Sequence, residues 1–165
     1  KVKGVDILIS AFAVVKRKIN CKLIIVGSGN YEVKLKKHVR SLKIENDVYF
    51  LGEKLNPYPY FKFADAFILA SRNEGMPNVL LESMACELPV ISSDTGLGVN
   101  DIVVDGFNGI IAKSLNEKDL AEKIIYLYKN KKLADKMKKN GIDVINKKFK
   151  IDKMFKRYYD IFLKA

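Results

Sequence analysis

The sequence predicts an α/β domain built on a parallel β-sheet with helices on both of its faces. Short apolar segments alternate along the chain with amphipathic segments in which apolar residues recur at helical spacing. A length of 165 residues suits a single domain with a normal hydrophobic core. No apolar run approaches the ~18 residues of a membrane-spanning helix, and no signal peptide is recognisable, so we expect a cytoplasmic protein.

The first part of the chain contains two strands and two helices. A helix is expected over residues 5–18, where apolar side chains keep helical spacing. Residues 22–26 form a continuous apolar run, which is typical of a strand buried on both faces of a parallel sheet. The turn at residues 27–29 then opens a helix over 31–42, and the next strand is expected at 48–52.

The middle of the chain predicts a strand, a loop and the start of a helix in direct succession. A turn with two prolines at residues 56–59 leads into a short helix that ends near residue 64, and an apolar strand follows at 66–70. A polar loop then runs to Pro77, whose fixed φ suits a first helical turn. Free N–H groups and the helix dipole point to the same place in such a unit, so it predicts an anion site.

The last part predicts two more strands and a helical end. The strands are expected at residues 89–92 and 110–112, with a glycine-rich loop and a short helix between them at 94–103. Asn116 precedes Asp119 by three residues, which is the pattern of a helix N-cap. Helices are expected from this cap, over residues 132–148 and over residues 151–165.

Two acidic residues lie close to the predicted anion site. Glu74 stands in the loop, and Glu82 follows eight positions later, little more than one turn into the helix. Carboxylates there would repel a phosphate unless they bind something else, and the paired hydroxyls of a sugar or a ribose are suitable partners. The alternative is a loop acid together with a Glu that is favoured near a helix N-terminus by the dipole.

The residues between and after these two acids carry a resemblance to a known family. They are Glu74-Gly75-Met76-Pro77-Asn78-Val79-Leu80-Leu81-Glu82, followed by Met84-Ala85-Cys86 and by Pro89-Val90. This stretch resembles the signature of the retaining glycosyltransferases of family 4, whose fold is called GT-B. The resemblance extends over residues 3–165 and implies a Rossmann-like domain, the C-terminal, nucleotide-sugar-binding half of a two-domain enzyme.

The resemblance also implies a reaction. It is the transfer of a sugar from a nucleotide-diphosphate sugar to a glycan or lipid-linked acceptor, with retention of anomeric configuration and without a metal or cofactor. The Tyr-rich segment Asn56-Pro57-Tyr58-Pro59-Tyr60 resembles members that build surface polysaccharides from UDP-sugars, so we expect a UDP-sugar as the donor.

The family's functional residues map onto this chain one by one. Glu74, which would meet a donor-sugar hydroxyl, and Lys3, which would meet the diphosphate, are the implied catalytic residues. The alternative for Lys3 is that it is one surface lysine among many. Glu82 would bind the ribose hydroxyls. The other implied donor-binding residues, acting through their backbone or near the nucleotide base, are Gly75, Met76, Pro77, Asn78, Val79, Gly27, Leu51 and Gly52.

The chain departs from the family pattern at three places. Glu87 stands where the family usually has a glycine at the helix C-terminus, which puts the cap geometry in question. The segment at 98–101 replaces a Gly-Pro-x-Glu-type sequence, which weakens any transfer of phosphate contacts to that loop. Only Lys3 and Gly4 of the phosphate loop are present, so we expect a fragment that lacks its first strand and an N-terminal acceptor domain, and that is inactive alone. The helix at 151–165 is expected to cross to that missing domain.

The charge of the chain leaves further alternatives open. Its formal net charge is +11, and thirteen of its thirty Lys and Arg residues lie within 129–165, against four acids. This asymmetry indicates a polyanionic neighbour such as the inner face of the cytoplasmic membrane or a nucleic acid, although a solvated helical surface explains it equally well. No nucleic-acid partner is expected, because no helix-turn-helix, aromatic RNP-type or zinc pattern is present. A nucleotide-sugar epimerase or a phosphorylase of similar fold is the other alternative.

Overall fold

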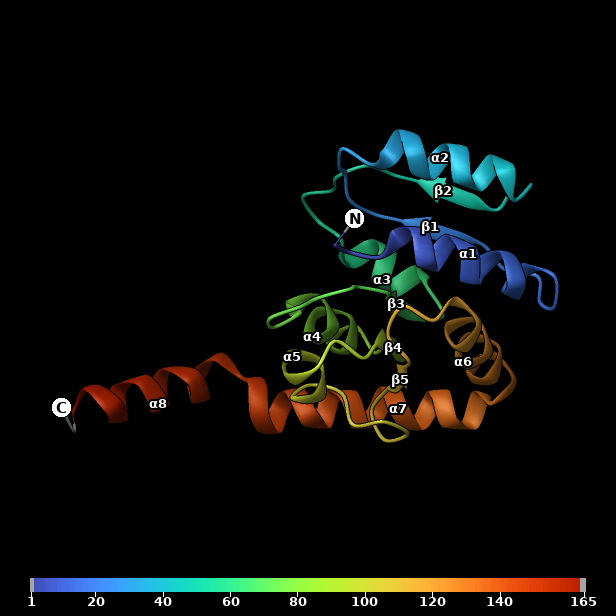
Figure 1. Ribbon diagram of the computed structural model, residues 1–165. Helices are drawn as coiled ribbons and strands as arrows, with labels where there is room; N and C mark the ends of the chain where they lie inside the picture. Colours follow the sequence, from blue (N-terminus) through green and yellow to red (C-terminus); the bar gives the residue numbers. More distant parts are fainter. Residues whose placement is uncertain (1, 164–165) are drawn as a thin grey trace.

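The strands of the computed structural model, which describes residues 2–163, form two parallel sheets (Figure 1). In the first sheet β1 (Leu23–Ile25) pairs with β2 (Val48–Phe50). The second sheet has the order β3-β4-β5, with β3 (Phe67–Leu69), β4 (Val90–Ser93) and β5 (Ile110–Ala112). All these pairings are parallel, because a helix or a longer crossover connects each strand to the next. The α/β class is therefore confirmed.

The helices alternate with the strands as predicted, with ends that differ by a few residues because helix ends fray. They are α1 (Val5–Lys16), α2 (Glu32–Ser41), α3 (Tyr58–Phe63), α4 (Asn78–Ala85), α5 (Leu97–Asn100), α6 (Glu117–Lys129), α7 (Lys131–Val144), the π-helical turn η1 (Ile145–Phe149) and α8 (Ile151–Phe162). At the start of α6 the side chain of Asn116 accepts a hydrogen bond from the Asp119 N–H at 3.0 Å, so the predicted N-cap is confirmed.

Helices cover both faces of the three-stranded sheet. Ile68 and Ile91 point into a cluster formed with α1 and α6, whereas Leu69 and Val90 point into a second cluster formed with α4 and the α5 region. This alternation follows from the two-residue period of a strand. Both clusters are apolar, so this sheet has the two-sided burial that is typical of doubly wound α/β folds.

The two-stranded sheet is covered on one face only. Leu23 and Ile25 pack with α1 and α2, but Ile24 is 43% exposed and Tyr49 is 45% exposed on the opposite face. The prediction that residues 22–26 are buried on both faces is therefore wrong. Both α1 and α2 lie on the side of Leu23 and Ile25, and the side of Ile24 and Tyr49 is more open to solvent.

Helix α1 joins the two sheets. Leu8 and Val15 belong to the cluster of the three-stranded sheet, while Ile9 and Phe12 belong to the cluster of the two-stranded sheet. Figure 1 accordingly shows α1 between the two groups of strands. Strands β1 and β3 both lie beside this helix but belong to separate sheets.

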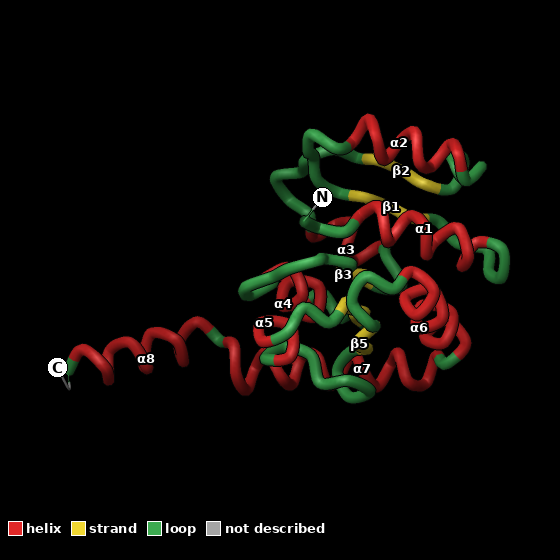
Figure 2. The backbone as a smooth tube through the Cα atoms, in the orientation of Figure 1, coloured by secondary structure: helices red, strands yellow, loops and turns green. Residues whose placement is uncertain are grey.

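Helix α8 extends away from the body of the molecule (Figures 1 and 2). Its large apolar residues are exposed, namely Ile151, Met154, Phe155, Tyr158, Tyr159, Ile161 and Phe162. Apart from η1, which precedes it directly, no helix or strand of the described chain packs extensively against α8. Over residues 2–163 no helix combines the length and apolarity needed to cross a membrane.

Glu87 ends α4 in the left-handed conformation that usually selects glycine. Its φ is 60°, the Glu87 N–H donates to the Met84 carbonyl at 3.0 Å, and the Leu88 N–H donates to the Ser83 carbonyl at 3.1 Å. These two bonds form a Schellman cap. The helix cap that Glu87 put in question is therefore present. It has a conformational cost, because a residue with a side chain is strained at positive φ.

Replacing this residue should relieve that cost. We expect Glu87→Gly to raise the free energy of unfolding by roughly 0.5–1 kcal/mol, because glycine adopts positive φ without steric penalty. Urea unfolding followed by circular dichroism measures the change. Glu87→Gln keeps the strain and removes only the charge, so an equal gain in that control would contradict the backbone explanation.

Candidate functional site

The loop between β3 and α4 meets the start of the chain at the carboxyl end of the three-stranded sheet. The Lys3 Nζ donates to Glu74 Oε1 at 2.8 Å, and the Arg72 N–H donates to the Val2 carbonyl at 2.8 Å. The structure therefore brings together Lys3 and Glu74, the two residues with an implied catalytic role, although 71 positions separate them. Their roles in a reaction remain a prediction.

The Glu74 side chain is held from two sides. Ser71, which is fully buried, donates its hydroxyl to Glu74 Oε1 at 2.6 Å, and Lys3 approaches the same oxygen. The Glu74 side chain is only 9% exposed, whereas that of Lys3 is 66% exposed. An ammonium group has three N–H donors, so Lys3 is able to keep Glu74 and still reach an anion on its solvent side.

A second ion pair links the same two segments. The guanidinium of Arg72 donates to both carboxylate oxygens of Asp6, with Nη1–Oδ1 at 2.7 Å and Nη2–Oδ2 at 2.6 Å. The hydrogen bond from Arg72 lowers the pKa of Asp6 below its ordinary value of 3.8, although partial burial opposes this shift. A lowered folded-state pKa means that the pair stabilises the protein above pH 3.8 and loses this effect as the pH falls through that lowered pKa. Sequence reasoning missed this pair.

Two glycines hold the loop by close backbone packing. Gly4 has φ of 60°, and a Cβ there would lie 1.7 Å from the Ala70 carbonyl oxygen. On the other side, a Cβ on Gly98 would lie 1.4 Å from the Gly75 carbonyl oxygen. Only glycine permits either approach, so these residues determine where the loop lies. The part played by Gly98 was not predicted, although the glycine-rich composition of its segment was the available signal.

The start of α4 differs slightly from the prediction. Pro77 is buried and occupies the N-cap, so the helix begins at Asn78. The Asn78 N–H donates to the Met76 carbonyl at 2.9 Å, and Pro77 has no N–H. Of the backbone N–H groups predicted to contact the donor within residues 76–79, those of Met76 and Val79 are therefore the ones available to a ligand.

Glu82 lies in the second turn of α4 and is half-buried. No described residue forms a hydrogen bond or an ion pair with its carboxylate. A half-buried carboxylate without a partner in the protein is suited to accept hydrogen bonds from a ligand. Glu82 thus differs from Glu74, whose partners are already in place.

Gly27, Leu51 and Gly52 come together at the carboxyl ends of β1 and β2. The Gly27 N–H donates to the Gly52 carbonyl at 2.8 Å, and the Leu51 N–H donates to the Ile25 carbonyl at 3.0 Å. These contacts occupy the Leu51 N–H and the Gly52 carbonyl. A nucleotide base would therefore have to use the Leu51 carbonyl or the Gly52 N–H.

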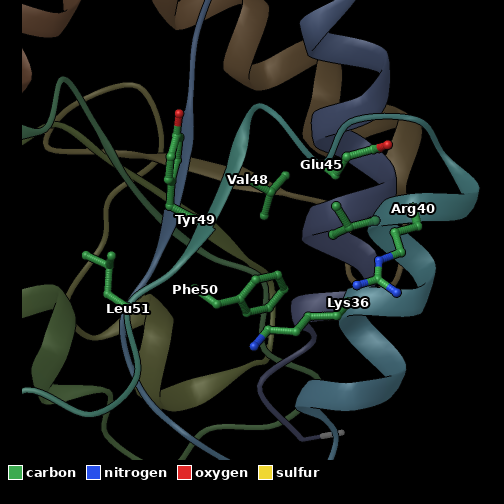
Figure 3. A pocket seen from close by; sticks show the side chains of 8 residues that line it. Lys36, Arg40, Glu45, Val48, Tyr49, Phe50 and Leu51 are labelled. Atoms are coloured by element: carbon green, nitrogen blue, oxygen red, sulfur yellow. The ribbon is translucent and has the colours of Figure 1, made fainter.

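Two hollows of the surface lie away from the two acids. A cavity of about 300 Å³ lies between α2 and β2 and is lined by Lys36, Val39, Arg40, Glu45, Val48, Tyr49, Phe50 and Leu51 (Figure 3). It shares only Leu51 with the predicted site. A second, of about 350 Å³, is lined by Asp6, Ile7, Ser10, His38 and Glu117. Neither is lined by Glu74 or Glu82, so a cleft shared by these two acids remains a prediction. Over residues 2–163, no three His, Cys, Asp or Glu residues are grouped to hold a metal ion.

Comparisons with known proteins give a consistent result. The family model described as glycosyl transferases group 1 matches residues 1–144. N-acetyl-alpha-D-glucosaminyl L-malate synthase of Bacillus anthracis is 30% identical over 162 residues, which are 98% of this chain and 42% of that enzyme. A Campylobacter jejuni enzyme, N-acetylgalactosamine-N,N'-diacetylbacillosaminyl-diphospho-undecaprenol 4-alpha-N-acetylgalactosaminyltransferase, is 32% identical over 133 residues, with 81% of this chain and 36% of that enzyme covered.

A solved structure extends the likeness to three dimensions. A mutant of TarM from S. aureus, in complex with Fondaparinux, alpha-GlcNAc-glycerol and UDP, superposes with a TM-score of 0.90 at 26% identity. The match covers 98% of this chain and 33% of that one. The chain spans less than half the length of the curated relatives it matches.

The packing of Gly98 against the loop leads to a test of stability. We expect Gly98→Ala to lower the free energy of unfolding by about 1–3 kcal/mol, because the new methyl group would overlap a backbone carbonyl that cannot rotate away. Gly29→Ala is the matched control, since a Cβ there would meet nothing within 4 Å and the residue does not have a positive φ. Urea unfolding compares the two, and equal effects would contradict the assigned contact.

Proposed function

This chain belongs to the glycosyl transferases group 1 family, and from that premise we propose that it is the donor-binding domain of a retaining glycosyltransferase. The enzyme transfers a sugar from a nucleotide-diphosphate sugar to a glycan or lipid-linked acceptor in polysaccharide or glycoconjugate biosynthesis. The observation that carries this proposal is the meeting of Lys3 and Glu74 at 2.8 Å beside the start of α4. A cation, an oriented carboxylate and a helix N-terminus then converge on one place.

Each of these groups has a distinct part in the proposed reaction. As the bond to the sugar breaks, negative charge grows on the leaving diphosphate, and Lys3 together with the N-terminus of α4 stabilises it. Glu74 accepts a hydrogen bond from a donor-sugar hydroxyl and orients the ring. Glu82 accepts hydrogen bonds from the ribose hydroxyls.

Two of the relatives support the choice of substrates. The TarM structure contains UDP, which supports a UDP-sugar as the donor. The Campylobacter enzyme is named for a diphospho-undecaprenol compound, which supports a lipid-linked acceptor. We extend both features to this chain as part of the proposal.

The separation of the two sheets supports the proposal that a further strand lies between β1 and β3. Strands β1 and β3 both lie beside α1 without pairing, and a parallel strand leading into Gly4 and α1 would fit between them. Strand, α1 and β1 would then form a βαβ unit, and the site would lie at the switch point of one continuous sheet. In this proposal the acceptor site belongs to a further domain, against which α8 packs its apolar face. The donor-binding domain described here is then inactive by itself.

The basic surface supports a location at the inner face of the cytoplasmic membrane. Lys131, Lys132, Lys136 and Lys139 on α7 are all exposed. Anionic lipid headgroups attract such a surface by about 1 kcal/mol for each lysine near the membrane. Lipid-linked acceptors are presented at the same surface.

The proposed role of Glu82 predicts a loss of nucleotide affinity. We expect Glu82→Ala to weaken UDP binding by roughly 1–3 kcal/mol, because ribose hydroxyls lose a charged acceptor. Isothermal calorimetry with UDP measures the change. Glu122→Ala, an exposed Glu on α6, is the control and should bind UDP like the wild type. Equal affinities for all three proteins would count against the proposed site.

The membrane proposal predicts binding that depends on charge. The protein should sediment with phosphatidylserine-containing vesicles at low salt and be released as the ionic strength rises, because screening weakens the attraction. Replacing the four α7 lysines by glutamine should abolish this binding. Equal sedimentation with neutral phosphatidylcholine vesicles would refute the electrostatic mechanism.

A further inference from the structure

The ion pair between Asp6 and Arg72 joins the two segments that carry the proposed catalytic groups. Asp6 lies in the first turn of α1, three residues after Lys3, and Arg72 lies two residues before Glu74. Two parallel hydrogen bonds of 2.7 and 2.6 Å connect the guanidinium to the carboxylate. Such a bidentate pair fixes orientation as well as distance, which a single lysine contact does not.

The contact between Lys3 and Glu74 is poorly suited to hold these segments during a reaction. Its lysine is largely exposed, and an arriving diphosphate would share the same ammonium group with Glu74. A single lysine contact that is shared with the donor does not fix the orientation of the two segments, so another interaction has to hold them in place. The ion pair of Asp6 with Arg72 is such an interaction, and the bond from the Arg72 backbone N–H to the Val2 carbonyl adds a further direct link.

Stability alone does not account well for this pair. Both side chains are partly exposed, with 27% for Arg72 and 43% for Asp6, and ion pairs of such exposure contribute little to folding. A bidentate geometry between residues 66 positions apart is therefore better explained by the placement of the segments it joins.

We propose that Asp6 and Arg72 are positioning residues, which hold Lys3 and Glu74 at the spacing that the donor requires. This inference rests on the proposed function and deepens it. Neither residue needs to touch the donor, so their effect passes through the backbone of residues 3–6 and 72–74. Arg72→Lys keeps the charge and loses the bidentate geometry, which makes it the sharpest variant.

The test uses the full-length enzyme with its nucleotide-sugar donor. We expect Arg72→Lys and Asp6→Asn to lower kcat tenfold or more, with UDP affinity changed less than threefold and the melting temperature nearly unchanged. The exchanged pair, Asp6→Arg with Arg72→Asp, should recover most of the lost kcat. The matched control is Asp47→Asn, which removes ion pairs with Lys16 and Lys22 at the amino ends of β1 and β2 and should leave kcat unchanged.

The outcomes separate the two proposals. If the wild type binds UDP and transfers sugar while Arg72→Lys and Asp6→Asn match it in kcat, the positioning role is refuted and the proposed function stands. A kcat loss that follows the loss of melting temperature, or that Asp47→Asn reproduces, also refutes the role. If the wild-type enzyme neither binds UDP nor transfers sugar, both proposals fall.

Discussion

The close approach of the α1 N-terminus to the loop after β3 is the constraint on which the site depends. Gly4 lets the two backbones touch at the Ala70 carbonyl, where any side chain would overlap it. Around this contact lie the hydrogen bond to Val2 and the ion pair of Asp6 with Arg72. The helix that follows Gly4 contributes apolar side chains to the clusters of both sheets, so the position of the loop is tied to the packing of the core.

Charged residues are arranged differently at the candidate site and on α7. At the site, the cations Lys3 and Arg72 are matched by carboxylates at hydrogen-bond distance. On α7, four exposed lysines stand against two acids, Asp135 and Asp143. The first arrangement orients individual groups, whereas the second creates a field that attracts any anionic surface. The two therefore serve different parts of the proposed function, donor chemistry and location.

Two apolar surfaces remain exposed in this domain, and each suits a partner within the proposed enzyme. One is the face of β1 and β2 that carries Ile24 and Tyr49, and the other is the stripe along α8. Large apolar patches of this kind typically mark places where another element or protein packs. Two curated relatives are more than twice as long as this chain, and in the proposed enzyme a further domain would cover these surfaces.

The sequence by itself determined the order and type of the elements and the identity of the central motif. Helical spacing, short apolar runs and the Asn116 cap are local signals, so the alternation of strands and helices was predicted and confirmed. The residues between and after Glu74 and Glu82 likewise indicated a glycosyltransferase, and the match to the glycosyl transferases group 1 model confirms the prediction at that level. Whether Glu74 and Glu82 bind a nucleotide sugar is still a prediction.

Only the tertiary structure decided which distant groups meet and which surfaces are covered. Asp6 and Arg72 are 66 positions apart, and nothing local to either indicates the other. The sequence shows that residue 98 is a glycine, but its contact with the Gly75 carbonyl depends on how α5 packs. The prediction that residues 22–26 are buried on both faces was wrong for the same reason. Apolar composition indicates that a strand can be buried, but the faces that are actually covered depend on where the neighbouring helices pack.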